Sequence, residues 1–502
     1  MKVKGQSGKF ILAVDQSTSA TKVMLFDAGA NLIDRLSFPH QQYYPADGFV
    51  EHDPEEIFEN TVKGMTGILQ LRGLNASDLA VIAITNQRET SLIWDKNTGK
   101  PVANAAVWQC QRGHDFCKQL IAEGYGPEIR QKTGLIIDPY FSASKLRWII
   151  NEVEGAQEIA QRGDLLLGTM DSWLLGKLTN GKVHATDYSN ACRTMLFNIN
   201  TLQWDAALIS LFDLYPSMFP EVKFSDQIFG TTDPSVVFDQ PVPIAGLLGD
   251  SHAALFGQNC FESGMAKATY GTGSSIMMNI GNQPLTSPDG LVTSIGWGRA
   301  GVIDYVFEGN IHCTGDTINW LVNDAELISN ASESELLALS VNDNNQVYFV
   351  PSFVGLGAPY WDNEARACIS GMGRNTKKAH IVRAALESIA YQVKDLIDLM
   401  VKNGRVVFRE MRVDGGPTRN NFLMQFQSDI LEKEVVRSNI EEVSALGAAF
   451  MAGLACGFWK DPEEIMALRM VDKIFMPKMP SEETEKLYSG WKLAVRRSRL
   501  VK

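Results

Sequence analysis

The sequence contains little cysteine and no long apolar run. Its 502 residues include only seven cysteines, and none of them has the CxxC or Cys/His spacing that is typical of a zinc site. This pattern predicts reduced thiols and a cytoplasmic protein. The uncharged stretch that is richest in apolar residues, residues 443–459, is shorter than the roughly 20 residues that a membrane-spanning helix needs. We therefore expect a closely packed buried helix there and no membrane span.

The sequence also has no excess of basic residues. Lysine and arginine total 46 against 58 aspartates and glutamates, which gives a formal net charge of -12. A nucleic acid is therefore not expected as a partner, because domains that bind one usually carry a basic patch. Hydrophobic residues make up 45% of the chain, and this fraction together with the length predicts two or three folded domains.

The familiar nucleotide-binding motifs are absent from the sequence. It contains no GxxxxGK[ST] loop, no GxGxxG loop that leads from an apolar strand into a helical pattern, and no HRD or DFG segment. These absences disfavour a P-loop enzyme, a Rossmann dehydrogenase and a protein kinase.

Two similar hairpins are expected, one in each half of the chain. Residues 9–27 and residues 265–280 both read as two apolar strands around a turn that is rich in hydroxyl groups or glycine. Strand-like runs at 79–85 and 410–416 and a helical pattern at 379–401 follow them. This repeated mixture of strands and helices predicts an α/β fold in both halves.

The boundary between the halves is expected near residues 249–258. No Pro- or Ser-rich linker separates them, so we predict two packed domains, residues 1–254 and 255–502, that meet across a central cleft. Small-molecule sites are often found in such a cleft.

The two hairpin turns are candidate phosphate-binding sites. Residues 15–19 read Asp-Gln-Ser-Thr-Ser and residues 271–274 read Gly-Thr-Gly-Ser, so hydroxyls and backbone N–H groups could hold phosphate oxygens from opposite sides. Hairpin tips of this composition are also common without any ligand. Asp250 follows an apolar run and is either a helix N-cap or a carboxylate in the cleft that accepts a hydroxyl proton; the pattern leaves both open.

Longer segments of the sequence resemble one known family. Gln87-Arg88-Glu89-Thr90 and the RVDGG segment at residues 412–416 are the most specific pieces of a likeness to glycerol kinases, within the FGGY carbohydrate kinases, that runs from about residue 10 to 460. The resemblance implies two actin-like (ribonuclease H-like) ATPase domains, with ATP in the central cleft. It also implies phosphorylation of a small polyol, with glycerol as the first choice. The alternatives are a longer polyol or a ketose or, in a different class, an actin- or Hsp70-like nucleotide-switched assembly protein.

The resemblance also implies a role for individual residues. Asp15 would organise a magnesium ion. The ATP phosphates would contact Gln16, Ser17, Thr18, Ser19 and Lys22 from the first half and Gly271 and Thr272 from the second. The adenosine would lie among Gly315, Asn319, Gly416 and Asn420. The polyol would lie among Arg88, Glu89, Trp108, Tyr140, Asp250 and Ser251, with Asp250 also acting as the general base.

These residue types suit a polyol. It presents only hydroxyl groups, so a selective pocket needs an acceptor such as Glu89, a donor such as Arg88 and an apolar wall such as Trp108. Without the resemblance, Arg88 and Glu89 would also fit a solvated ion pair, and Trp108 and Tyr140 would fit core aromatics.

The sequence departs from the family pattern close to the expected reaction site. Three positions differ from the usual Gly, Arg and Gln: Ser17, Lys22 and Asn319. Ser251 and His252 replace a Gln-Gln pair, and Ser275 replaces a Phe beside the polyol. We therefore expect a larger and more polar substrate pocket, which leaves the identity of the polyol open. Family members are often homodimers or homotetramers, and the sequence leaves the oligomeric state open as well.

Overall fold

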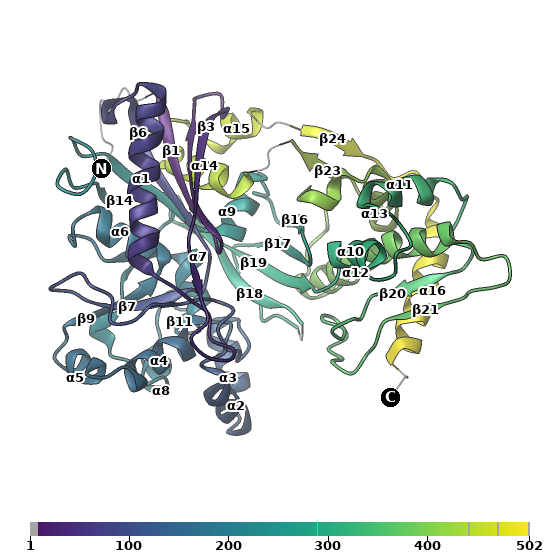
Figure 1. Ribbon diagram of the computed structural model, residues 1–502, viewed down its shortest axis with the longest axis horizontal. Helices are drawn as coiled ribbons and strands as arrows, with labels where there is room; N and C mark the ends of the chain where they lie inside the picture. The colour runs from purple at the N-terminus through teal and green to yellow at the C-terminus, as the bar shows by residue number, and fades with distance from the viewer. Residues whose placement is uncertain (1–8, 289, 440–441, 469–470, 500–502) are drawn as a thin grey trace.

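The computed structural model describes residues 9–288, 290–439, 442–468 and 471–499. Figure 1 shows two bodies side by side, one built mainly from the first half of the chain (purple to teal) and one from the second half (green to yellow). The ends of the two predicted domain ranges, residues 1–8 and 500–502, lie outside the described residues.

A six-stranded sheet forms the centre of the first half. Its strand order is β14 (Ile228–Thr231), β15 (Pro243–Gly249), β6 (Leu79–Asn86), β1 (Phe10–Gln16), β2 (Ala20–Phe26) and β3 (Leu32–Pro39). β1, β2 and β3 are antiparallel neighbours, whereas β6 is parallel to both β1 and β15. The predicted hairpin at residues 9–27 and the predicted strand at 79–85 are confirmed.

A seven-stranded sheet forms the centre of the second half. Its order is β18 (Val292–Arg299), β19 (Val302–Ile311), β17 (Ser274–Gly281), β16 (Met265–Tyr270), β22 (Glu410–Asp414), β23 (Val435–Ser438) and β24 (Val471–Phe475). β19, β17 and β16 are antiparallel neighbours, and β22 is parallel to both β16 and β23. Both halves thus contain three antiparallel strands followed by two parallel ones, which confirms the predicted pair of α/β domains.

The candidate residues follow the carboxyl ends of the parallel strands. In the first sheet, Gln16 and Gly249 both pair with Asn86, so β1, β6 and β15 end at one edge. The hairpin turn, the Arg88 segment and Asp250 begin at that edge. Open α/β sheets bind their ligands there, because loops from several strands meet at the carboxyl ends.

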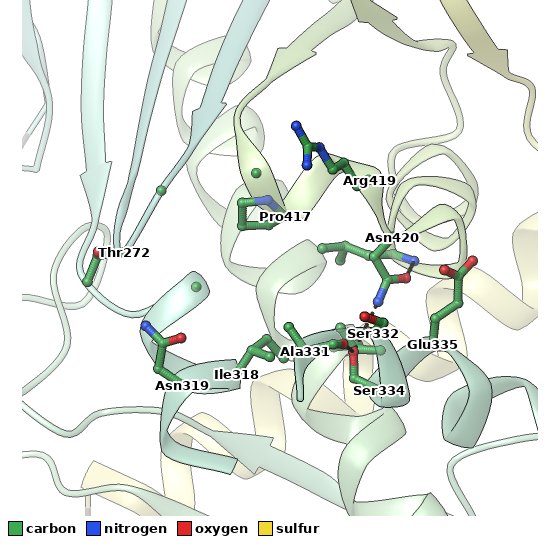
Figure 2. Close-up of a pocket in the computed structure, with 15 residues that line it drawn as sticks. Thr272, Ile318, Asn319, Ala331, Ser332, Ser334, Glu335, Pro417, Arg419 and Asn420 are labelled. Atoms are coloured by element: carbon green, nitrogen blue, oxygen red, sulfur yellow. Dashed lines mark hydrogen bonds between the residues drawn. The ribbon is translucent and has the colours of Figure 1, made fainter. Parts of the chain in front are cut away.

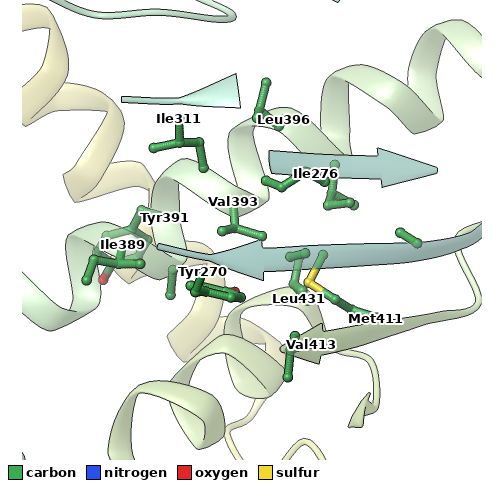
Figure 3. Close-up of a cluster of buried hydrophobic side chains, with 14 of the residues drawn as sticks. Tyr270, Ile276, Ile311, Ile389, Tyr391, Val393, Leu396, Met411, Val413 and Leu431 are labelled. Carbon is green, nitrogen blue, oxygen red and sulfur yellow. The ribbon is translucent and has the colours of Figure 1, made fainter. Parts of the chain in front are cut away.

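Each half contains a long helix. α1 (Pro54–Arg72) begins after Asp53, whose carboxylate accepts the N–H of Glu55 and so caps the helix. α12 (Lys378–Gly404) confirms the helical pattern at 379–401. Figure 3 shows its Val393 and Leu396 in the buried cluster with Ile276 and Ile311 of the second sheet.

The small-residue helix predicted at 443–459 is α14 (Val443–Cys456), and it is buried as expected. It packs against α9 (Asp250–Gly257) so closely that a Cβ on Gly447 would lie 1.8 Å from the carbonyl oxygen of Ala253. α14 shares one hydrophobic core with strands of the first sheet. A helix from the end of the chain therefore completes the core of the first half. The predicted boundary after residue 254 falls within α9 and stays a prediction.

The other helices lie around the two sheets (Figure 1). They are α2 (His114–Ala122), α3 (Gly126–Thr133), α4 (Ser142–Glu152), α5 (Ala156–Gln161), α6 (Met170–Leu178), α7 (Tyr188–Ala191), α8 (Ala206–Leu211), α10 (Gly315–Asn323), α11 (Ala331–Leu339), α13 (Asn421–Leu431), α15 (Pro462–Ala467) and α16 (Ser481–Arg499). A five-stranded sheet has the order β4 (Gln42–Tyr43), β5 (Glu51–His52), β8 (Ala105–Ala106), β7 (Ser91–Asp95) and β9 (Leu165–Thr169). Within the described ranges, no helix has the length and apolar character that crossing a membrane requires.

Candidate active site

The first hairpin turn joins β1 to β2 and is fixed from inside. Its Ser17 N–H and hydroxyl both donate to the carbonyl of Ala20, at 2.9 and 2.8 Å. The Gln16 side chain is fully buried, donates to the Ser17 carbonyl at 2.8 Å and accepts from Gln87 Nε2 at 3.1 Å. The Gln16 amide therefore shapes the turn instead of projecting from it.

Asp15 lies near the end of β1, just before this turn, and it pairs with Lys22 of β2. It is almost fully buried, and burial raises the pKa of its carboxyl to about 7, with Lys22 lowering it and Asp250 and Glu442 raising it further. The Lys22 ammonium forms an ion pair with Glu442 at 2.8 Å. The lysine predicted to contact phosphate is thus held beside the beginning of α14.

The second hairpin turn is fixed by the residues that lead into α10. The Gly315 N–H donates to the Gly271 carbonyl at 2.9 Å, and the N–H groups of Thr314 and Asp316 donate to the Thr272 carbonyl at 3.0 Å. A Cβ on Gly315 would lie 2.4 Å from the Gly271 oxygen, so this approach requires glycine. The turn and the helix start form one rigid unit.

A pocket of about 420 Å³ opens beside this unit, and we call it the turn pocket (Figure 2). All six nucleotide residues predicted in the second half line it: Gly271, Thr272, Gly315, Asn319, Gly416 and Asn420. The sequence prediction missed nine further lining residues: Ile318, Ala331, Ser332, Ser334, Glu335, Leu386, Pro417, Arg419 and Leu423. Most of these are on helices whose periodicity gave no sign of a ligand, although Pro417 and Arg419 directly follow the predicted Gly416.

Arg88 and Glu89 follow β6 and belong to a buried network of charges. Arg88 donates to both carboxylate oxygens of Glu308, at 2.9 and 3.0 Å, and Arg193 contacts Glu308 at 2.9 Å and Glu89 at 2.5 Å. Because Arg88 and Glu89 are adjacent, these four residues close a ring, which we call the charged ring. The alternative of a solvated ion pair is wrong, since each of the four side chains is at most 6% exposed.

Neither Arg193 nor Glu308 was predicted as a site residue. Burial alone would raise the pKa of the Glu308 carboxyl, but Arg193 and Arg88 together hold it well below its usual value. Their sequence surroundings contain no motif that would have identified them.

Asp250 is the first residue of α9, and Gly249 occupies the N-cap position. The N-cap alternative for Asp250 is therefore wrong. The Asp250 carboxylate lies 3.2 Å from Arg88 Nε and keeps 37% of its side chain exposed, so it connects the charged ring with the open space at the sheet edge. Ser251, on the same turn of α9, donates its N–H to this carboxylate.

Trp108 and Tyr140 lie side by side and are only partly buried. Their rings meet edge to face at 5.5 Å between centroids, and Trp108 Nε1 donates to the Thr18 hydroxyl at 2.9 Å. Trp108 therefore contacts the first hairpin turn, which a side chain of the hydrophobic core would not do.

The replaced residues Ser275 and His252 lie near the charged ring. On β17, Ser275 is two residues from Met277, which pairs with Glu308, so Ser275 faces the same side of the sheet as Glu308. Among the residues that the structure describes, the buried hydroxyl of Ser275 has no hydrogen-bond partner, and neither ring nitrogen of His252 has one. Burial, with Arg88 nearby, holds the pKa of His252 well below its usual value. Ser275 and His252 are therefore polar, as expected, and their buried polar atoms lack hydrogen bonds within the described part of the chain.

Comparison with family models covers most of the chain. Residues 10–257 match the N-terminal domain and residues 266–456 match the C-terminal domain of the FGGY family of carbohydrate kinases. The glycerol kinase of Caldanaerobacter subterraneus subsp. tengcongensis is 50% identical over 490 residues, which is 98% of each chain. Glycerol kinase 1 of Thermotoga maritima is 51% identical over 488 residues, 97% of this chain and 99% of the relative.

Solved structures show the same relationship. The crystal structure of Plasmodium falciparum glycerol kinase with ADP has a TM-score of 0.93 and 37% sequence identity, and the match covers 98% of both chains. The gluconate kinase from Lactobacillus acidophilus is 21% identical with a TM-score of 0.88, and this likeness shows the fold alone. With two matching domain models and relatives near 50% identity, the chain belongs to the FGGY family of carbohydrate kinases.

Proposed function

We propose that this chain transfers the γ-phosphoryl group of ATP to a small polyol, with glycerol as the first choice and glycerol 3-phosphate as its product. The observation that carries the proposal is the position of Asp250. Its partly exposed carboxylate lies beside Arg88 at the edge of the first sheet, where a proton acceptor for a polyol hydroxyl is needed. The relatives that are about 50% identical are named glycerol kinases.

ATP would occupy the turn pocket and extend its phosphates toward the two hairpin turns. The pocket combines apolar side chains, such as Ile318 and Leu423, with polar ones such as Asn319 and Asn420, which suits an adenosine. The rigid turn at Gly271 and Thr272 and the hydroxyl-rich turn after Asp15 would contact the phosphates.

Asp15 fits a magnesium ion that arrives with ATP. Among the residues that the structure describes, no group of three or more His, Cys, Asp or Glu side chains could hold a metal. Mg²⁺ in kinases needs only one or two carboxylates besides substrate phosphates, and the buried Asp15 has a raised pKa that a nearby cation would lower. When bound, the ion would neutralise charge on the transferred phosphoryl group.

The polyol would lie between the charged ring and the aromatic pair. Arg88 donates two of its five N–H groups to Glu308 and forms an ion pair with Asp250 at 3.2 Å, so three N–H groups remain for a hydroxyl oxygen. Glu89 and Asp250 offer acceptors, and Trp108 with Tyr140 offers an apolar wall. Asp250 would take the hydroxyl proton as the oxygen attacks the γ-phosphorus, in one in-line step without a phosphoenzyme.

Two further statements belong to the proposal. All seven cysteines are free thiols, which supports a cytoplasmic enzyme. Homodimers or homotetramers, as the resemblance implies, are proposed for the oligomeric state.

The test is whether ATP turnover depends on a polyol. ADP release by the full chain is measured with MgATP alone and with glycerol, tetritols, pentitols or ketoses. The proposal expects strong stimulation by glycerol. Stimulation only by a longer polyol or a ketose would correct the substrate, and turnover that ignores every compound would support a nucleotide-switched protein instead.

A further inference from the structure

Glu308 brings a residue of the second half into the proposed polyol site. It lies on β19, its side chain is 1% exposed, and both of its carboxylate oxygens are paired. Oε1 accepts from Arg88 Nη2 at 3.0 Å, and Oε2 accepts from Arg88 Nη1 at 2.9 Å and lies 2.9 Å from Arg193 Nη1. Two parallel hydrogen bonds of this kind fix the plane of a guanidinium group.

The orientation of Arg88 determines what Asp250 contacts. With its two terminal nitrogens held by Glu308, Arg88 directs Nε toward Asp250 at 3.2 Å. Arg193 holds Glu308 from the other side and is itself held by Ser294 at 2.8 Å. The carboxylate of Asp250 is thus placed by a chain of contacts that begins on the second sheet.

Glu308 also sets the balance of charge around Asp250. The charged groups that act on Asp250 are Arg88 after β6, Asp15 on β1 and Lys267 on β16. The groups that act on Glu308 are Arg88, Arg193, Glu89, Lys267 and Tyr140, with neutral His252 beside them. Without the negative charge of Glu308, both arginines would be undercompensated, and the positive charge of Arg88 would act more strongly on Asp250.

We propose that Glu308 is a positioning residue for the phosphoryl transfer: from the second half of the chain it fixes Arg88 and, through Arg88, the proton acceptor Asp250. The site would then be complete only where the two halves meet. This inference rests on the proposed polyol kinase function.

The test compares wild type with Glu308→Gln, which keeps the shape and removes the charge. We expect kcat to fall at least ~10-fold and the KM for the polyol to rise, with the dissociation constant of MgATP unchanged. The acidic limb of the kcat profile should move to lower pH, because a less compensated Arg88 disfavours protonation of the neighbouring carboxylate. Loss of folded protein alone would lower the amount of active enzyme and leave this limb in place.

Two further variants keep the test informative. Glu308→Asp retains the charge, so the acidic limb should return toward the wild-type pH while kcat recovers only in part. Asp395→Asn is a matched control, since Asp395 is a buried carboxylate that accepts from Tyr360, Tyr488 and Trp491 in the second half, away from the charged ring. It should lower the thermal midpoint without moving the pH profile.

The inference is overturned if Glu308→Gln keeps the wild-type kcat, polyol KM and acidic limb, or if it loses only stability as Asp395→Asn does. Should Glu308→Gln fail to fold, Glu308→Asp decides: an unchanged kcat and KM in that variant would contradict the inference. A wild-type chain without polyol-dependent turnover is a different result, because it removes the proposed function itself.

Discussion

The turn pocket and the charged ring lie at the ends of the two sheets, but they are built from different kinds of residue. The turn pocket is lined mainly by glycine, short polar and aliphatic residues, and its shape comes from backbone contacts such as Gly315 against Gly271. The charged ring consists of two arginines and two glutamates that are almost completely buried. A pocket shaped by backbone should tolerate the loss of one side-chain group, whereas loss of a charge beside the ring leaves its partner uncompensated.

The largest expected effect is at the edge of the charged ring. Asp250→Asn keeps the size of the side chain but removes its capacity to accept a proton, so kcat should fall by at least ~100-fold. Calorimetry should find MgATP binding largely unchanged, because the turn pocket is separate. A near-normal kcat would show that Asp250 is not the general base. It would also show that the charged ring is no more sensitive to substitution than the turn pocket.

A smaller effect is expected in the turn pocket. Thr272→Val removes one hydroxyl at nearly constant shape and should weaken ATP binding or turnover by about 1 to 3 kcal/mol, the usual cost of losing a hydrogen bond to a charged group. The measurement is the dissociation constant of MgATP together with kcat. If both stay at wild-type values, the second turn is only a hairpin tip and takes no part in phosphate binding.

The substrate preference should change by a similar or smaller factor. Ser251→Gln together with Ser275→Phe fills the polar space near the charged ring, so the ratio of kcat/KM for glycerol over a four-carbon polyol should rise roughly tenfold. The wild type should accept longer polyols better than glycerol kinases do. A wild type that is strictly selective for glycerol, with an unaltered ratio in the double variant, would place both residues outside the pocket wall.

The last expected effect is on stability and not on catalysis, and it concerns the hydrogen bond between Gln87 and His52. His52 contacts Gln87 at 3.2 Å, and burial, with His40 beside it, lowers the pKa of His52 to about 3. Below the unfolded pKa of about 6.5, the unfolded chain takes up a proton that the folded chain does not, so acidification to about pH 4 costs stability.

The matched variant is His52→Asn, which keeps an acceptor near Nδ1 but cannot titrate. Between about pH 6 and 4, the free energy of unfolding of this variant should fall less steeply with decreasing pH than that of wild type. The two slopes should differ by about 1.4 kcal/mol per pH unit. Urea titrations at several pH values measure this slope. Parallel slopes for the two proteins would show that His52 does not stay neutral in the folded state.

Local parts of the fold could be predicted because short sequence segments determine them. The two hairpins are visible as apolar runs around polar turns, and Asp53-Pro54 marks the beginning of α1. The six predicted residues of the turn pocket come from short segments with distinctive glycines or amides, and the resemblance located them.

Contacts between distant segments could not be predicted in this way. Glu308 is 220 residues from Arg88, and Arg193 is 104 residues from Glu89, so no local pattern connects them. Similarly, the composition of residues 443–459 predicts a buried helix, but only the structure shows that α14 completes the core of the first half. The role of Asp250 as N-cap or cleft carboxylate also depended on where Gly249 ends β15.

The proposed function requires that the two halves form one site that moves a phosphoryl group from ATP directly to a polyol hydroxyl. The most direct measurement follows MgATP and glycerol by phosphorus NMR with the full chain, in wild type and in Asp250→Asn. We expect one polyol phosphate ester for each ADP formed by wild type, with almost no inorganic phosphate, and neither product at a comparable rate in the variant. ADP accompanied by inorganic phosphate, at a rate that does not depend on glycerol or on any longer polyol, would contradict the proposed function.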